Sequence, residues 1–175
     1  MKSQLSMLAN YNLRMNKQVY TCIEGLSSES FIEDRGLYFG SICGTLNHLL
    51  VGDILWLKRF ASHPSTFAAL DYVRRLEKPT ALDAVIYTDF KALKAVRIRM
   101  DAMLCEFIQS LNETDLKGSL SYKNTKGDSF CKSMAALLLH LFNHQTHHRG
   151  QITTVLNQLG FDYGVTDLLL EIPDR

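Results

Sequence analysis

The sequence has few cysteines, and none of them is arranged to bind zinc or to form a disulfide framework. Cys22, Cys43, Cys105 and Cys131 are scattered over 175 residues without a CxxC pair. Each lies in an apolar context that is typical of a helix. Zinc–thiolate sites and disulfide-rich secreted folds are therefore disfavoured. We expect reduced, buried thiols in a cytoplasmic protein.

The chain also lacks a charge imbalance and a long apolar run. Nineteen Lys and Arg residues stand against 18 Asp and Glu residues, for a formal net charge of +1. That balance provides no electrostatic basis for binding nucleic acid or an anionic membrane. No apolar stretch approaches the roughly 20 residues of a membrane span. Asn10 and Arg14 interrupt the segment where a secretion signal would need an apolar core. We expect no nucleic-acid and no membrane partner.

Several catalytic patterns are missing as well. The sequence has no serine nucleophile elbow, no glycine-rich phosphate loop and no Glu-x-x-His pattern of a di-iron site. Only three prolines interrupt the chain, so long helices are possible. These absences disfavour serine hydrolases, nucleotide-binding enzymes and di-iron carboxylate proteins.

Four segments have the apolar periodicity of amphipathic helices. They cover about residues 5–26, 41–61, 80–111 and 129–159. Ser41 is a suitable N-cap for the second segment, and Pro64 ends it. Thr80-Ala81-Leu82-Asp83 is a variant capping box that would start the third. The pattern predicts an all-α helix bundle, and the length fits a single domain over residues 1–175.

The connections between these segments are polar. We expect loops at about 27–40 and 65–79, the second with a short turn. Between the last two helices, Leu120, Tyr122 and the turn candidate 124–127 would allow a small β-hairpin. One more turn of helix is expected at about 167–170, before Pro173.

Two groups of polar residues lie within the predicted helices. Tyr11, Asn12 and Asn16 occupy the first helix, either on a partly exposed face or lining an interior cavity. The third helix carries a basic run, which we interpret as a solvated face, with anion binding as the alternative. That run is Lys91, Lys94, Arg97 and Arg99.

Histidines are concentrated in the last predicted helix. Four of the six lie within nine residues, at positions 140, 144, 147 and 148. The apolar stripe of this helix runs through Leu137, Leu141, Ile152, Val155 and Leu159. His148 falls in the middle of the stripe and His144 one turn earlier, near its edge. Two imidazoles at i and i+4 can bridge a metal ion, whereas a core histidine with a satisfied hydrogen bond is the alternative.

A third imidazole is available on the second helix. His48 has Gly44 and Gly52 one turn to either side, which leaves room for a neighbouring helix or a ligand. Three neutral imidazoles match the ligand count of a catalytic zinc-type site, in which water or substrate takes the fourth position. A water bound there would have a lowered pKa, and a thiol would bind as thiolate. His63, beside Pro64, is not expected to be a ligand.

We therefore expect one divalent ion per chain, held by His48, His144 and His148. Zinc or nickel is favoured, and iron, manganese or copper is also compatible with such ligands. Candidates for residues that orient the imidazoles are Asp53, Asn143, His147 and Gln151, although helical periodicity alone does not aim their side chains.

Three segments of the chain together resemble the DinB family. They are Tyr11-Asn12 with Met15-Asn16, the stretch FGSICGTLNHLLVGD at 39–53 with Trp56 and Arg59, and HLFNHQTHHRGQ at 140–151. The resemblance implies an up-down-down-up four-helix bundle, often a homodimer. It also implies one divalent metal held by three histidines, which correspond to His48, His144 and His148. Some members of the wider superfamily use low-molecular-weight thiols such as bacillithiol or mycothiol as S-transferases or isomerases.

Two classes of function remain open from the sequence. The first is a metal-dependent enzyme, in particular a thiol S-transferase acting on a small electrophile, or a metal-dependent hydrolase. The second is a non-catalytic, metal-binding stress-response bundle that works as a dimer. An open coordination position favours the first class, and a fourth protein ligand favours the second.

Overall fold

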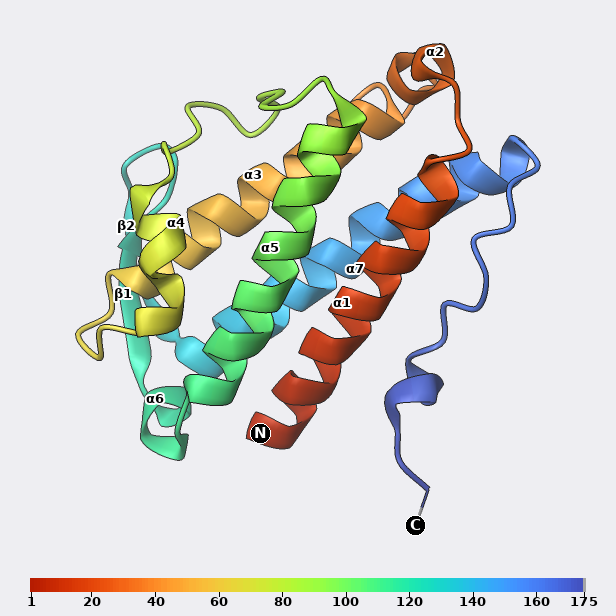
Figure 1. Cartoon of the computed structure of the whole chain (residues 1–175). Coiled ribbons are helices and arrows are strands. Elements are labelled where there is room, and N and C mark those ends of the chain that lie inside the picture. The colour runs from red at the N-terminus through yellow and green to blue at the C-terminus, as the bar shows by residue number, and fades with distance from the viewer. Residues whose placement is uncertain (175) are drawn as a thin grey trace.

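The computed structural model describes residues 1–174 and is mostly helical, with one small antiparallel sheet. Its four long helices are α1 (Lys2–Ile23), α3 (Ile42–Ala61), α5 (Phe90–Ser110) and α7 (Met134–Gln158). The short elements are α2 (Ser28–Ile32), η1 (Ala68–Leu70), α4 (Asp71–Arg75), α6 (Glu113–Lys117), β1 (Ser119–Lys123), β2 (Ser129–Ser133) and η2 (Leu168–Glu171). Figure 1 shows the long helices side by side, with the hairpin and α6 near one end.

The four long helices pack in pairs around one hydrophobic core. Helix α1 lies against α5 and α7, and α3 lies against α7 and α5. Figure 1 shows α1 and α7 running in one direction and α3 and α5 in the other. Phe60 of α3 and Phe107 of α5 are fully buried, with ring centroids 5.7 Å apart. Burial of such large apolar side chains contributes roughly 1.5–3 kcal/mol each.

The second helix begins where the sequence predicts. The Ser41 side chain accepts a hydrogen bond from the Gly44 backbone N–H at 3.0 Å, so Ser41 is the N-cap of α3. The first helix also agrees with its prediction to within a few residues.

The predicted start of the third helix is wrong. Residues 80–89 contain no helix, and α5 begins after Asp89, whose side chain accepts from the Ala92 N–H at 2.8 Å. Leu82, expected in the apolar stripe, is 48% exposed. The backbone of this segment bonds to α3 instead: the Leu82 carbonyl lies 2.8 Å from His48 Nδ1, and the Ile86 N–H donates to Asn47 Oδ1 at 2.8 Å. Those groups are unavailable for helical hydrogen bonds.

The hairpin prediction is confirmed, and it shortens the last helix. Strand β2 occupies residues 129–133, where the apolar pattern predicts helix, and pairs antiparallel with β1 from Ser119↔Ser133 to Lys123↔Ser129. At the turn, Asn124 Oδ1 accepts from the Lys126 and Asp128 N–H groups, and Gly127 has a φ of +94°. Helix α7 then begins after Ser133.

Other expectations are met in part. The connection at 27–40 contains α2, and that at 65–79 contains η1 and α4, while η2 supplies the turn expected near 167–170. All four cysteines are free, but only Cys43 is buried: Cys22 and Cys105 are partly exposed, and Cys131 is exposed on β2. Among the described residues, no helix has the length and apolar character needed to cross a membrane.

Candidate metal centre

The structure brings together the three histidines singled out from the sequence. His48 lies on α3, and His144 and His148 lie one turn apart on the facing side of α7. Each offers a ring nitrogen, and these three nitrogens all lie within 4.8 Å of one another. The Nε2 atoms of His48 and His144 are 2.9 Å apart.

Hydrogen bonds at the far nitrogens orient two of the rings. His48 Nδ1 lies 2.8 Å from the Leu82 carbonyl oxygen, and His148 Nδ1 lies 2.8 Å from Gln151 Oε1. An oxygen of this kind only accepts, so each Nδ1 carries the proton and each Nε2 keeps its lone pair. Both Nε2 lone pairs are thereby available to a cation. This is the usual way in which proteins fix a metal-binding tautomer.

Two glycines make the close packing around these rings possible. A Cβ on Gly52 would lie 2.9 Å from His144 Cε1, so a side chain there would displace the ring. A Cβ on Gly44 would collide with the Phe39 carbonyl oxygen. Because Gly44 lets Phe39 approach, the Phe39 ring stacks on His48 with centroids 3.7 Å apart and an interplanar angle of 17°. One face of His48 is thus covered by an aromatic ring.

All three imidazoles are held in the neutral form. His48 and His148 are only 6% and 8% exposed, and burial lowers the pKa of both. Burial, followed by repulsion from His148 and His48, lowers the pKa of His144 to about 3. A neutral imidazole is the form that binds a metal ion.

The donor set fits one divalent cation. Two nitrogen lone pairs 2.9 Å apart repel each other unless a proton or a metal ion lies between them. Tetrahedral zinc, with Zn–N near 2.0–2.1 Å, would need each pair of nitrogens about 3.3 Å apart, which lies between the 2.9 Å of this pair and the 4.8 Å within which all three lie. Among the described residues, no fourth His, Cys, Asp or Glu joins the group. His144 Nδ1 is buried and has no hydrogen-bond partner within the described chain.

Of the four residues predicted to orient the imidazoles, only one is hydrogen-bonded to a histidine of the centre. Gln151 contacts His148, as expected of an orienting residue. His147 is exposed beside His148, Asn143 is exposed, and Asp53 bonds to other partners. The contacts of Phe39 and the Leu82 carbonyl with His48 are not predicted from the sequence, because both residues lie in connections whose position depends on tertiary contacts. Residue spacing contains no signal for them.

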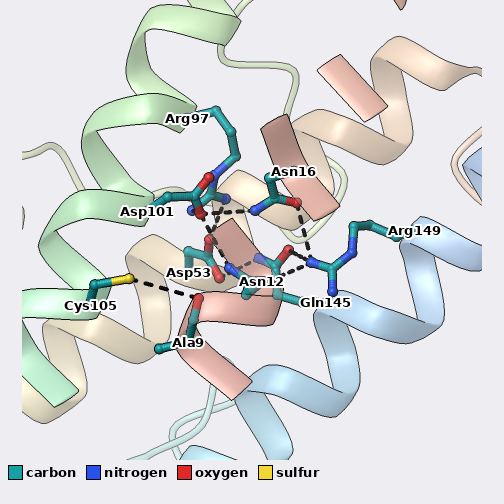
Figure 2. A network of polar contacts seen from close by, with 9 residues as sticks. All are labelled: Ala9, Asn12, Asn16, Asp53, Arg97, Asp101, Cys105, Gln145 and Arg149. Carbon is teal, nitrogen blue, oxygen red and sulfur yellow. Dashed lines mark hydrogen bonds and ion pairs between the residues drawn. The ribbon is translucent and has the colours of Figure 1, made fainter. Parts of the chain in front are cut away.

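Figure 2 shows a buried polar network that contains the sequence neighbours of the metal-centre residues. Asp53 and Gln145, the residues that directly follow Gly52 and His144, are joined by a 2.6 Å hydrogen bond. Arg97 of α5 donates to Asp53 and forms an ion pair with Asp101 at 2.9 Å, at an angle outside hydrogen-bond geometry. Arg97 was predicted to lie on a solvated face, and it is instead buried.

Amide side chains extend the network to α1, the remaining long helix, and to Arg149 of α7. Asn12 and Asn16 of α1 donate to Asp101 at 3.2 and 2.8 Å and accept from Arg149 of α7. Both are buried, so the partly exposed face considered for them is ruled out. Burial lowers the pKa of Arg149 to about 10. Two buried cations and two buried carboxylates therefore bridge α1, α3, α5 and α7.

Comparisons with known proteins agree on one family. The sequence model of the DinB family matches residues 1–174. The Protein DinB of Bacillus subtilis (strain 168) is 26% identical over 160 residues, which cover 91% of this chain and 88% of that protein. The crystal structure of a DinB-like protein from Bacillus cereus ATCC 10987 superposes with a TM-score of 0.60 at 18% identity. The match covers 86% of this chain and 89% of that one.

Proposed function

Because the chain belongs to the DinB family, we propose that it binds one divalent metal ion through His48, His144 and His148 and acts as a metal-dependent thiol S-transferase. The observation that carries this proposal is the donor set. Three neutral imidazoles converge, and no fourth His, Cys, Asp or Glu of the described chain joins them. Such a set leaves a coordination position for a small molecule, as in catalytic sites, whereas structural sites are closed by four protein ligands.

The residues of the chain would prepare this position for a thiol. A divalent cation held there would act as a Lewis acid and lower the pKa of a thiol or water in the open position. Phe39 and the segment around Leu82 shield His48 from solvent, so charges at the centre would be less screened than in water. Gln151 and the Leu82 carbonyl hold two rings in a fixed tautomer and orientation.

Metal content tests the first half of the proposal. His48→Ala removes one of three imidazoles, and we expect wild type to hold about one zinc or nickel ion per chain and the variant to lose it. Iron, manganese and copper belong in the same elemental analysis of untagged protein. His63→Ala is the matched control, because His63 stacks on Phe67 outside the cluster. If wild-type protein takes up no metal, the three histidines are core residues and not metal ligands.

The bundle is expected to survive the loss of His48. Its folding free energy comes mainly from apolar burial along four long helices, so circular dichroism of His48→Ala should remain helical. His48 is as buried as His148, so some loss of stability is expected from the cavity. An unfolded variant would indicate a structural metal.

Enzyme activity requires a separate screen. Protein reconstituted with zinc or nickel is incubated with low-molecular-weight thiols and electrophilic acceptors, and thiol consumption is measured. Metal-dependent transfer that His48→Ala abolishes supports the proposal. Hydrolysis of an ester or amide without any thiol would assign a metal-dependent hydrolase.

A non-catalytic, metal-binding stress-response dimer is the second candidate. The cover that Phe39 provides over His48 favours it, since a covered centre restricts access. We also infer an up-down-down-up four-helix topology, a single domain, homodimer formation and a reducing, cytoplasmic location. The helix directions in Figure 1 support the up-down-down-up topology, and the four free cysteines support the reducing location. Metal binding without turnover in the thiol screen would favour this candidate.

A further inference from the structure

A second pocket, away from the histidines, is lined by positive charges. It has a volume of about 250 Å³ and lies between the C-terminal half of α3, the segment after α4, and the turn of the hairpin. Lys58 and Arg59 come from α3, Lys78 from the segment and Lys123 from β1. We call this the cationic pocket.

The charges of the cationic pocket are not neutralised by the described chain. No Asp or Glu lines the pocket, and none of its four cations lies within ion-pair distance of a carboxylate among residues 1–174. Elsewhere on the surface, Arg14 pairs with Glu171 and Lys94 pairs with Glu24. In a chain of net charge +1, four unpaired cations around one cavity are a local concentration.

Two of the cations are held in place. The Arg59 guanidinium lies 4.4 Å from the Trp56 ring centroid and 5.0 Å from that of Tyr122. Lys58 Nζ donates to the Arg74 carbonyl at 3.1 Å. Burial lowers the pKa of both side chains, and the charge of Lys78 lowers that of Lys58 further. This mutual repulsion opposes the folded arrangement, and a bound anion would relieve it.

The pocket shares a face of α3 with the histidines. His48, Gly52, Trp56 and Arg59 follow one another at intervals of four, four and three residues, so they lie along one side of the helix, about 16 Å from first to last. On α7, the centroid of the His140 ring lies 5.2 Å from that of Trp56 and 6.2 Å from that of His144. A continuous row of aromatic and imidazole rings therefore joins the two sites.

We propose that the cationic pocket binds a small multivalent oxyanion, either a phosphate ester or a polycarboxylate. A guanidinium presents paired N–H donors that match such oxygens, and ammonium groups add charge. Ser62 and Thr125, which carry neutral hydroxyl groups, are also among the lining residues. A volume of about 250 Å³ suits a small molecule rather than a polymer. The site does not depend on the metal.

Calorimetric titration of the metal-free 175-residue chain with pyrophosphate and with tricarballylate, at constant ionic strength, tests this site. Lys78→Gln/Lys123→Gln removes two exposed cations of the pocket. Arg59→Gln removes the cation that lies over the Trp56 ring. Lys17→Gln/Lys91→Gln, which changes two exposed lysines on other helices, is the charge-matched control. Circular dichroism confirms that each variant is folded.

We expect saturable binding of at least one probe by wild type. Each pocket variant should weaken it at least about tenfold, because a charge-assisted contact is lost, and the control should change it less than about twofold. The probe that binds distinguishes phosphate from carboxylate ligands. Absence of saturable binding, or equal weakening by control and pocket variants, would overturn the proposal. Since metal is removed first, neither result depends on the histidine site.

Discussion

At position 52, the lack of a side chain decides where the His144 ring can lie. An alanine Cβ there would approach His144 Cε1 to 2.9 Å, so the ring must rotate or move along α7. His144 Nε2 would then leave its position beside His48 Nε2. We predict that Gly52→Ala weakens metal binding at least about tenfold, because displacement of one ligand by a few tenths of an ångström disturbs the coordination geometry.

Gly150→Ala is the matched control for this prediction. It places the same methyl group on α7 at a position where no atom lies within 4 Å, and there alanine should stabilise the helix by up to about 1 kcal/mol. Competition with a chromogenic zinc chelator measures the affinity of both variants. Equal affinities would show that the His144 ring adapts without leaving the site.

For single residues, the sequence predicts which histidines come together but not which residues surround them. The i, i+4 spacing of His144 and His148 on an apolar helix face indicates a shared position, and small neighbours identify His48. Helical periodicity, however, relates residues only along one helix. Phe39 and Leu82 reach His48 from connections, so their contacts become visible only in three dimensions.

Among the elements, the segment of residues 80–89 depends most on contacts outside itself. Asn47 is fully buried, and its side chain accepts from the Ile86 and Tyr87 N–H groups at 2.8 and 2.9 Å and donates to the Tyr87 carbonyl at 2.8 Å. Four residues before Ile86 in the same segment, the Leu82 carbonyl lies 2.8 Å from Nδ1 of His48, the residue that follows Asn47 on α3. Asn47 therefore fastens the segment to α3 beside the metal centre.

We predict that Asn47→Ala lowers the free energy of unfolding by about 2–4 kcal/mol, since two backbone N–H groups lose their acceptor and a cavity forms. Amide hydrogen exchange should accelerate at Ile86 and Tyr87, and zinc affinity should fall because the Leu82 carbonyl no longer stays on His48. Asn143→Ala, an exposed change on α7, is the control. Unchanged exchange at residues 86–87 would refute the role of Asn47.

The same contacts explain which elements the sequence predicts. Helix α3 starts at a local signal, the Ser41 cap, and its start is predicted correctly. The Thr80–Asp83 signal is also local, but hydrogen bonds to Asn47 compete with it and determine the backbone. Helix α7 is shortened because residues 129–133 pair with β1. The helix boundaries predicted from the sequence are therefore wrong where long-range hydrogen bonds replace local ones.

Across the whole molecule, the buried network of Figure 2 links all four long helices. Arg97 is its central cation, in contact with both Asp53 and Asp101. We predict that Arg97→Met lowers the free energy of unfolding by about 3–5 kcal/mol, because it leaves two buried carboxylates without their cation. Arg99→Met, which removes an exposed charge from the same helix, should cost far less. Urea unfolding of both variants provides the comparison, and equal costs would contradict the prediction.

The network also gives stability a pH dependence that can be assigned to one group. Burial raises the pKa of Asp101 to about 6, despite the opposing attraction of Arg97, whereas an unfolded chain has an Asp pKa of about 3.9. Between these values the folded protein binds more protons than the unfolded chain. The free energy of unfolding contributed by Asp101 is therefore fully present below about pH 4 and is lost as pH rises through about 6.

Asp101→Asn removes this titration while keeping the shape of the side chain. The difference in unfolding free energy, wild type minus variant, should fall by on the order of 3 kcal/mol between about pH 4 and 6 and stay level above that. Urea unfolding at half-unit pH steps on metal-free protein measures it. Both proteins carry the same histidines, whose protonation cancels in the difference. A difference that stays constant from pH 4 to 7 would mean that Asp101 is already ionised at pH 4, with attraction from Arg97 outweighing its burial.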